Sequence, residues 1–585
     1  MRYVRMWTNA VAGAVLMAAY VAVLVLQLNP QLPVVSMTAL AWLGAVVAFY
    51  APYLSVLLFF LMLGRDLLSV EPLRPAWLSV RLLAWFGAVG AGAAAALTWA
   101  NLSAFSTILS DIARERMRAG AYATTVLAVA LLAITVLRYS VARRGSRPVA
   151  TLLVTCLALS VAVPVWLRGP GEIPVLPRPG GGTPHAGLRQ PAAFAPRVSI
   201  YALDGASLGF IRQRVAAGQF PNLGRLLDRA ATIDLATLTP TEAEPIWAAA
   251  ATGKSPQQNG IRSNVSYRAD ERDVVAADVL PDYCFASALP DQGFVQRFAP
   301  TSASLAARPM WAILSDYGIV SGVAGWPLSY PARADRGFVL SDRFDEAASE
   351  PLRLRDASAG DPTTAVDIAR EIFDRWQATS RAEVMPALAL DLPDPVGLNQ
   401  ARWDRAYQES VLALAPQFAP RLTAVRFEGL ATFGRAYLGD AQPELFGNRS
   451  RVDPQRSVLD QHYALIDAEI GQAMRRLEPG DLLLVVSGFG MEPSALARRL
   501  IARVFGRPDF TGTQQAAPDG FLMAYGTNVS SGSFGRGTIL DLAPTVLYYM
   551  GVDVGKDMDG FARTDLFIPT YVLEHPVKYV ASHER

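Results

Sequence analysis

Hydrophobic residues are concentrated in the first 167 residues of this 585-residue chain, and this uneven distribution constrains the fold more than any other feature. Apolar runs lie at about 7–27, 33–63, 82–101, 121–138 and 149–167. An α-helix needs about 20 apolar residues to cross a membrane, so these runs predict a five-helix transmembrane region over residues 1–167. Pro52 lies inside the longest run and leaves open whether 33–63 is one helix or two.

Charge distribution predicts the orientation of these helices. The first 167 residues carry twelve Arg, no Lys and four acidic residues, whereas the remaining 418 carry 41 basic and 47 acidic residues. By the positive-inside rule, Arg2 and Arg5 place the N-terminus in the cytoplasm, together with the Arg-rich loops near 65–81 and 138–147. Five crossings then place the large remainder outside the cytoplasm. Residues 102–120, which carry three Arg on the outer side, are predicted to form a short amphipathic interfacial helix.

The composition excludes several functions. No apolar run has an ionisable residue at its centre, which favours a membrane anchor in the lipid bilayer over an ion-coupled transporter. Two cysteines exclude a disulfide scaffold and a multi-cysteine zinc site. The residues after 167 contain no basic run or nucleic-acid-binding motif, so we expect no nucleic acid partner.

After the apolar region, residues 168–197 are rich in Pro and Gly and are predicted to form a linker. From 198 to 572, short apolar strands such as VSIYALDG and DLLLVVSGFG alternate with helical segments, and 573–585 is expected to be a C-terminal tail. This alternation predicts an α/β domain with a mainly parallel central sheet flanked by helices. Active sites of such sheets gather at the carboxyl ends of the strands, where Asp204 and residues 487–490 are placed.

Several sequence blocks in this domain resemble the alkaline phosphatase superfamily, and within it the type I phosphodiesterase/nucleotide pyrophosphatase branch. They are IYALDGASLGFIRQRVAAGQFPNLGRLLDRAA, TLTPTEAEPIWAAAATGKSPQQNGI, GFVLSDRF, RFEGLATFGRAY, DLLLVVSGFGM and the block that begins PDGFLMAYG. The ordered set spans roughly 198–565. An outward-facing domain of this kind behind five membrane helices also resembles lipoteichoic acid synthases and phosphoethanolamine transferases.

The resemblance implies phosphoryl transfer by a Thr or Ser nucleophile and two zinc ions held by carboxylates and imidazoles. The first family aspartate is present as Asp204. The nucleophile position, counted back from Gly253 and confirmed in register by Pro245, is Ala243, whose methyl group cannot attack phosphorus. Thr239 and Thr241 are the nearest hydroxyl groups.

The remaining family ligand positions have also changed. An aspartate and a histidine are expected at Ala431 and Arg435, an aspartate and a histidine at Gly488 and Phe489, and a last histidine at or near Gln514. A lone Asp204 cannot hold two zinc ions, so we expect no metal and no other cofactor. The four histidines do not repair the site, because His185 lies in the linker and the others are expected to be ordinary surface or tail residues: His462, His575 and His583.

Without metals, Asp204 would be an unpaired buried charge, which is energetically costly. We therefore expect Arg435, on the far side of the same cleft, to supply the missing positive charge.

These observations lead to three hypotheses about function. The first is a membrane-anchored pseudoenzyme that serves as a scaffold or accessory subunit, with membrane protein partners and with any ligand unknown. The second is an active metal-dependent phosphodiesterase or phosphotransferase with a relocated site. The third is a lipid-handling membrane module.

Overall fold

The computed structural model describes residues 1–68, 73, 75–137, 147–171, 195–270, 275–281, 283–349, 357–386, 397–446, 457–496, 499, 510–515 and 517–584. The chain divides into two compact units. One contains residues 1–175 and 265–299, and the other contains residues 176–264 and 300–585. Most of the predicted linker 168–197, with its His185, lies outside the described residues. Most arginines of the loops near 65–81 and 138–147 also lie outside them.

Five helices in the first unit are long and apolar enough to cross a membrane, which confirms the predicted number. Their bounds are α1 Arg2–Leu28, α2 Met37–Leu68, α3 Val80–Ala104, α4 Asp111–Val136 and α5 Arg147–Arg168. Pro52 lies inside α2, which is one continuous helix. The prediction of a separate interfacial helix over 102–120 is wrong. Ser110 caps α4, and residues 111–120 form the first turns of α4.

The first unit also contains an insertion from the later part of the chain, which a continuous domain over 198–572 does not anticipate. Residues 265–299 hold β3 (Ser266–Arg268), α10 (Ala288–Asp291) and β4 (Gln296–Phe298). Leu289 and Val295 share an apolar core with Trp42 and Phe49 of α2. Buried apolar contact with the helices therefore places this segment in the first unit.

The second unit is built on a ten-stranded sheet in the order β13-β2-β12-β9-β1-β8-β5-β6-β7, with β14 beside β2. The strands β9, β1, β8, β5 and β6 are parallel, and β12 is antiparallel to both of its neighbours. This mostly parallel sheet confirms the predicted fold class. The strand bounds are β1 Val198–Leu203, β2 Ala231–Ala236, β5 Ser321–Ala324, β6 Gly337–Leu340, β7 Gly360–Asp361, β8 Leu422–Phe427, β9 Leu482–Phe489, β12 Asp519–Gly526, β13 Gly532–Ser533 and β14 Gly537–Thr538.

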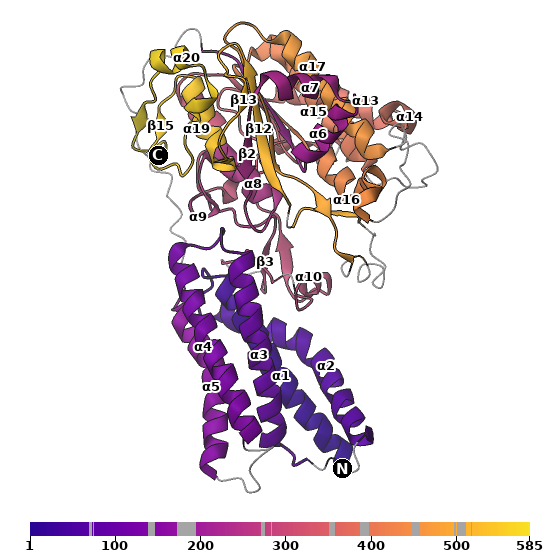
Figure 1. The fold of residues 1–585 in the computed structure, drawn as a ribbon, viewed down its shortest axis with the longest axis vertical. Helices are drawn as coiled ribbons and strands as arrows, with labels where there is room; N and C mark the ends of the chain where they lie inside the picture. Colours follow the sequence, from indigo (N-terminus) through magenta and orange to yellow (C-terminus); the bar gives the residue numbers. More distant parts are fainter. Residues whose placement is uncertain are drawn as a thin grey trace. The chain divides into compact units, whose positions relative to one another are not determined.

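Helices cover both faces of this sheet (Figure 1). Successive residues of its strands point to opposite faces, and they are therefore buried in two separate apolar cores. In β1, Tyr201 and Leu203 belong to one apolar core, and Ile200 and Ala202 belong to the other. The first core is covered by α6 Leu208–Ala216, α7 Pro221–Arg229, α13 Thr363–Ala378, α15 Leu398–Phe418, α16 Gly429–Ala441 and α17 Val458–Arg476. The second is covered by α8 Ala243–Thr252, α11 Met310–Asp316 and α19 Leu542–Tyr549.

Short elements complete the second unit. They are α9 Pro256–Asn259, α12 Phe344–Ser349, α14 Arg381–Val384, α20 Pro569–Glu574, β10 Glu492–Pro493, β11 Gly512–Thr513, β15 Val554–Gly555 and β16 Tyr579–Val580. The segment predicted as a C-terminal tail is folded onto the domain, since β16 pairs with β15. The buried Lys254 ammonium also binds Asp557 at 2.6 Å and Glu584 at 2.9 Å.

Candidate functional site

The family positions identified in the sequence gather at one edge of the sheet, where the parallel strands β9, β1 and β8 end side by side. Asp204 follows β1, and the turn after β8 leads into α16. A Cβ atom added to Gly205 would lie 3.1 Å from the Cα atom of Ala431, so these two elements are in close contact. β11, immediately before Gln514, packs against α16 near Gly434.

Asp204 is the carboxylate that the resemblance assigns to the family site, and protein groups occupy both of its oxygens. The residue as a whole is 1% exposed. Oδ2 accepts hydrogen bonds from Arg426 Nε at 3.0 Å and from Arg426 Nη2 at 2.5 Å, and Oδ1 accepts one from the Trp247 indole. Burial raises the pKa of Asp204, and the Arg426 charge opposes that rise.

Arg426, on β8, therefore takes the role that the sequence analysis assigned to Arg435. That expectation is wrong, because the charged partner of Asp204 in the described chain is Arg426. Arg426 also lies 3.5 Å from the Glu428 carboxylate. Burial by itself would lower the pKa of Arg426, but the neighbouring Asp204 and Glu428 carboxylates raise it above its ordinary value. Arg435 lies on α16 and is partly exposed.

Ala243 is the first residue of α8 and is 8% exposed, so the nucleophile position holds a buried methyl group at the start of a helix. The nearby Thr241 hydroxyl is also buried and donates to the Leu238 carbonyl at 3.1 Å. The following residue, Glu244, has a carboxyl group whose pKa burial raises to about 7, with Arg426 opposing the rise.

The positions where ligands are expected, at the ends of β8 and β9, hold side chains that pack in the apolar cores. Ala431 belongs to the apolar core under α16, and Phe489 is fully buried in the core on the α8 face. A Cβ atom added to Gly488 would collide with the side chain of Ile246. The space that an aspartate needs at position 488 is therefore filled by α8. Gln514 follows β11 and is partly exposed.

Next to Arg426 lies a small acidic pocket of about 20 Å³ that the sequence analysis missed. Asp342 accepts the Leu328 and Tyr330 backbone amides, each at 3.0 Å. The pKa of Asp345 rises to about 7, chiefly through burial and then through the nearby Glu428 charge. The residues that line the pocket are Gly325, Asp342, Asp345, Gln400, Trp403, Asp404, Tyr407, Arg426 and Glu428. Two sequence signals were available, the Ser-Asp that follows β6 and the arginine inside the apolar strand LTAVRF.

His462 was expected to be an ordinary surface residue, and this expectation is wrong. It is 2% exposed, and its Nε2 atom lies 2.9 Å from Asp404 Oδ2. Asp404 also accepts the backbone amides of Glu428 at 2.9 Å and Gly429 at 3.0 Å. This pair therefore positions the turn between β8 and α16. His575 is exposed, and His583 Nε2 lies 2.8 Å from the Asp553 carbonyl oxygen.

The residues of the cleft do not fit a zinc pair. Arg426 and Trp247 hold both oxygens of Asp204, and the side chains at 243, 431, 488 and 489 carry no donor atom. Within the described ranges, no three His, Cys, Asp or Glu side chains are arranged to hold a metal ion. Near Arg426, the carboxylates of Asp342 and Asp404 accept hydrogen bonds from backbone amides instead.

The sequence matches the family described as type I phosphodiesterase / nucleotide pyrophosphatase over residues 200–526. No curated protein matches the chain. Among solved structures, murine ectonucleotide pyrophosphatase/phosphodiesterase 5 is similar, at 12% identity and a TM-score of 0.37, covering 64% of this chain and 100% of its own. An inactive variant of that protein, solved in complex with AMP, gives the same values. Because the family match extends over more than half of the sequence, the chain belongs to the type I phosphodiesterase / nucleotide pyrophosphatase family.

Proposed function

We propose that the chain is a membrane-anchored, catalytically inactive member of its family that serves as a scaffold or accessory subunit of a membrane protein complex. The observation that carries this proposal is the closure of Asp204 by Arg426 and Trp247. Arg426 and Trp247 bond to both of the oxygens through which Asp204 would bind a metal ion. Ala243 supplies no nucleophile to the same cleft.

The electrostatics of the pair supports a structural role for the remaining carboxylate. A buried carboxylate without a metal or a cation is strongly destabilising, whereas an arginine that donates two N–H groups to it restores charge balance. Arg426 does so from the neighbouring strand, in register with Ala202 of β1. The pair therefore stabilises the sheet edge without offering an open coordination position.

The proposed setting is a lipid bilayer, with the N-terminus in the cytoplasm and the large domain outside it. Five apolar helices are far more than a tether requires, and they offer surface to neighbouring membrane proteins. The second unit retains two apolar cores, which hold its sheet and covering helices together as a framework for a partner to bind. Retained packing together with a closed cleft favours binding of a partner protein over turnover of a substrate.

The catalytic part of the proposal is tested on the full chain purified in mild detergent. We expect no stoichiometric zinc or manganese by elemental analysis, and no hydrolysis of bis(4-nitrophenyl) phosphate that depends on Asp204. The Asp204→Ala variant is compared with Arg212→Gln, a change at an exposed residue of α6. One or two bound metal ions, together with turnover that only Asp204→Ala abolishes, would establish the relocated-site enzyme instead.

The binding part is tested by isolating the chain from its native membranes under conditions that preserve complexes. We expect it to comigrate with the same protein subunits in size-exclusion chromatography and in native electrophoresis. A lone monomer in both separations contradicts the scaffold role. Lipid bound in defined stoichiometry to such a monomer would support the lipid-handling alternative.

A further inference from the structure

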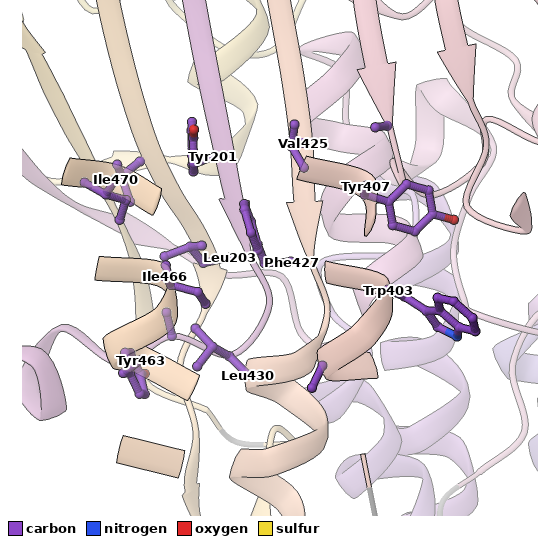
Figure 2. Close-up of a cluster of buried hydrophobic side chains, with 14 of the residues drawn as sticks. Tyr201, Leu203, Trp403, Tyr407, Val425, Phe427, Leu430, Tyr463, Ile466 and Ile470 are labelled. Carbon is purple, nitrogen blue, oxygen red and sulfur yellow. The ribbon is translucent and has the colours of Figure 1, made fainter. Parts of the chain in front are cut away.

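The second unit contains a cavity of about 560 Å³ at the amino-terminal edge of the sheet, the edge opposite the family cleft. α15 packs against β5 and β8, whereas α17 packs against α16 and α7, so the two helices leave a strip of β1 and β8 uncovered between them. Near the carboxyl ends of these strands, apolar side chains close this gap. Figure 2 shows Leu203, Phe427, Leu430 and Ile466 there, with Tyr201 nearer the amino ends.

The cavity is lined by both apolar and polar side chains. The apolar ones include Val425 on β8, Val411 and Ala415 on α15, and Leu477 after α17. The volume lies within the range of about 300–1,000 Å³ that is typical of small-molecule sites.

One buried polar group points to a ligand. Gln408 lines the cavity and is 3% exposed. Its Nε2 atom donates to the Tyr201 hydroxyl at 2.7 Å, but its Oε1 atom has no hydrogen-bond partner within the described residues. A buried acceptor left without a donor is costly, so this position favours a ligand that carries an N–H or O–H group. Burial raises the pKa of Tyr201, which therefore stays a neutral phenol.

The rim of the cavity is positively charged. Arg197 is neutralised by Glu478 at 2.6 Å and Asp481 at 2.9 Å. The exposed Arg421 and Arg476 also line the cavity, and Arg476 Nη2 donates to the neutral Gln472 Oε1 at 3.3 Å. Glu469, the acidic group on α17 that faces Gln408, has a pKa raised by burial, and the charge of Arg476 opposes that rise. Two exposed guanidinium groups beside apolar side chains complement a carboxylate at the end of an apolar body.

We propose that this cavity binds a small organic carboxylate with an apolar body and one hydrogen-bond donor. The carboxylate binds Arg421 and Arg476, the apolar body lies on Val425 and Leu477, and the donor bonds to Gln408 Oε1. The site is separate from the family cleft and does not depend on the proposed scaffold role.

The experiment uses N-acetyl-L-phenylalanine, which carries a carboxylate, a phenyl ring and an amide N–H, and its uncharged amide as the matched probe. Binding to the full chain in detergent is measured by calorimetry and by saturation-transfer NMR. For a ligand of this size we expect a Kd of about 0.1–1 mM for the acid and binding at least about tenfold weaker for the amide.

Three variants locate the binding. Arg421→Gln/Arg476→Gln should weaken binding of the acid about tenfold and leave binding of the amide unchanged, because only the charge-assisted contacts are lost. Ala415→Trp should abolish binding of both probes by filling the cavity. If Ala415→Trp does not fold, Leu412→Trp repeats this test. Arg212→Gln, on α6 away from the cavity, is the control. Equal Kd values for acid and amide, unchanged binding of the acid in Arg421→Gln/Arg476→Gln, unchanged binding in a folded Trp variant, or no binding at about 10 mM would overturn the proposal.

Discussion

Asp204 and Arg426 illustrate how two single residues balance each other's charge inside a protein. The two charged groups are almost completely removed from water, with side-chain exposures of 2% and 10%. Each therefore depends on the other, since a buried charge without a partner costs far more than the pair gains. Arg435, which chain position alone favoured for this role, lies on the helix that follows the strand.

Replacing Arg426 by Gln should lower the free energy of unfolding by about 3–5 kcal/mol, because Asp204 is left as an uncompensated buried charge. The matched change Arg435→Gln, at a partly exposed residue, should alter it by less than about 0.5 kcal/mol. Urea denaturation of the full chain in detergent, followed by tryptophan fluorescence, measures both. The double variant Asp204→Asn/Arg426→Gln should recover much of the loss. Equal losses in the two single variants would contradict the assigned pairing.

Glu244 should make stability depend on pH near neutrality. Its folded-state pKa of about 7 lies above the ordinary value of 4.5, so the folded chain holds a proton that the unfolded chain releases. This contribution is fully present below the unfolded pKa and is lost as the pH rises through about 7. Going from about pH 6 to pH 8 should therefore lower the free energy of unfolding by about 1 kcal/mol.

The variant Glu244→Gln should remove this part of the pH dependence, because the amide does not titrate. The measurement compares urea denaturation of the two proteins at the two pH values. An undiminished pH dependence in the variant would show that another group is responsible, and Asp345, whose pKa is also raised to about 7, would be the next residue to replace.

At the scale of elements, the insertion 265–299 shows how one part of the chain stabilises another that is distant in sequence. The carboxamide of Asn29, at the end of α1, donates to the Val279 carbonyl at 2.8 Å and accepts from the amides of Asp278 at 2.8 Å and Val279 at 3.0 Å. The Tyr283 hydroxyl donates to the Leu97 carbonyl of α3 at 2.7 Å. The ends of the apolar helices are thus bonded to an inserted segment.

Replacing Asn29 by Ala should loosen this segment without unfolding α1. Loss of its hydrogen bonds leaves backbone groups of the segment without partners, so the segment should open more easily. We therefore expect amide exchange at Asp278 and Val279 to be at least about tenfold faster. Hydrogen–deuterium exchange of the full chain measures this change. Ser103→Ala, which removes an exposed hydroxyl on α3, is the control and should leave both amides unchanged. Unaltered exchange in Asn29→Ala would mean that apolar packing alone holds the insertion.

At the scale of the whole molecule, an odd number of crossings places the two ends of the chain on opposite sides of a membrane. The basic residues Arg2 and Arg5 near the N-terminus favour the cytoplasmic side for that end. Reporter fusions test this prediction. A reporter that works only in the cytoplasm should be active at the N-terminus, and one that matures only outside it should be active at the C-terminus. Activity of one reporter at both ends would require an even number of crossings.

Much of this architecture follows from local patterns in the sequence. Apolar runs of membrane-spanning length predict α1 to α5, because a helix satisfies its own backbone in lipid. Continuous apolar strands such as Leu482–Phe489 indicate a sheet covered on both faces. The predicted parallel sheet places Asp204 and residues 487–490 at the same edge, because parallel strands end on the same side of a sheet.

Sequence alone therefore determined the number of apolar helices, the class of the fold and the absence of a hydroxyl at position 243. Only the tertiary structure decided that Arg426 pairs with Asp204 across 222 positions of chain, that His462 is buried against Asp404, and that 265–299 packs with the apolar helices. The physical reason is the distance along the chain over which each effect acts. Periodicity and spacing act between near neighbours, whereas burial and charge pairing depend on which distant segments the sheet order and helix packing bring together.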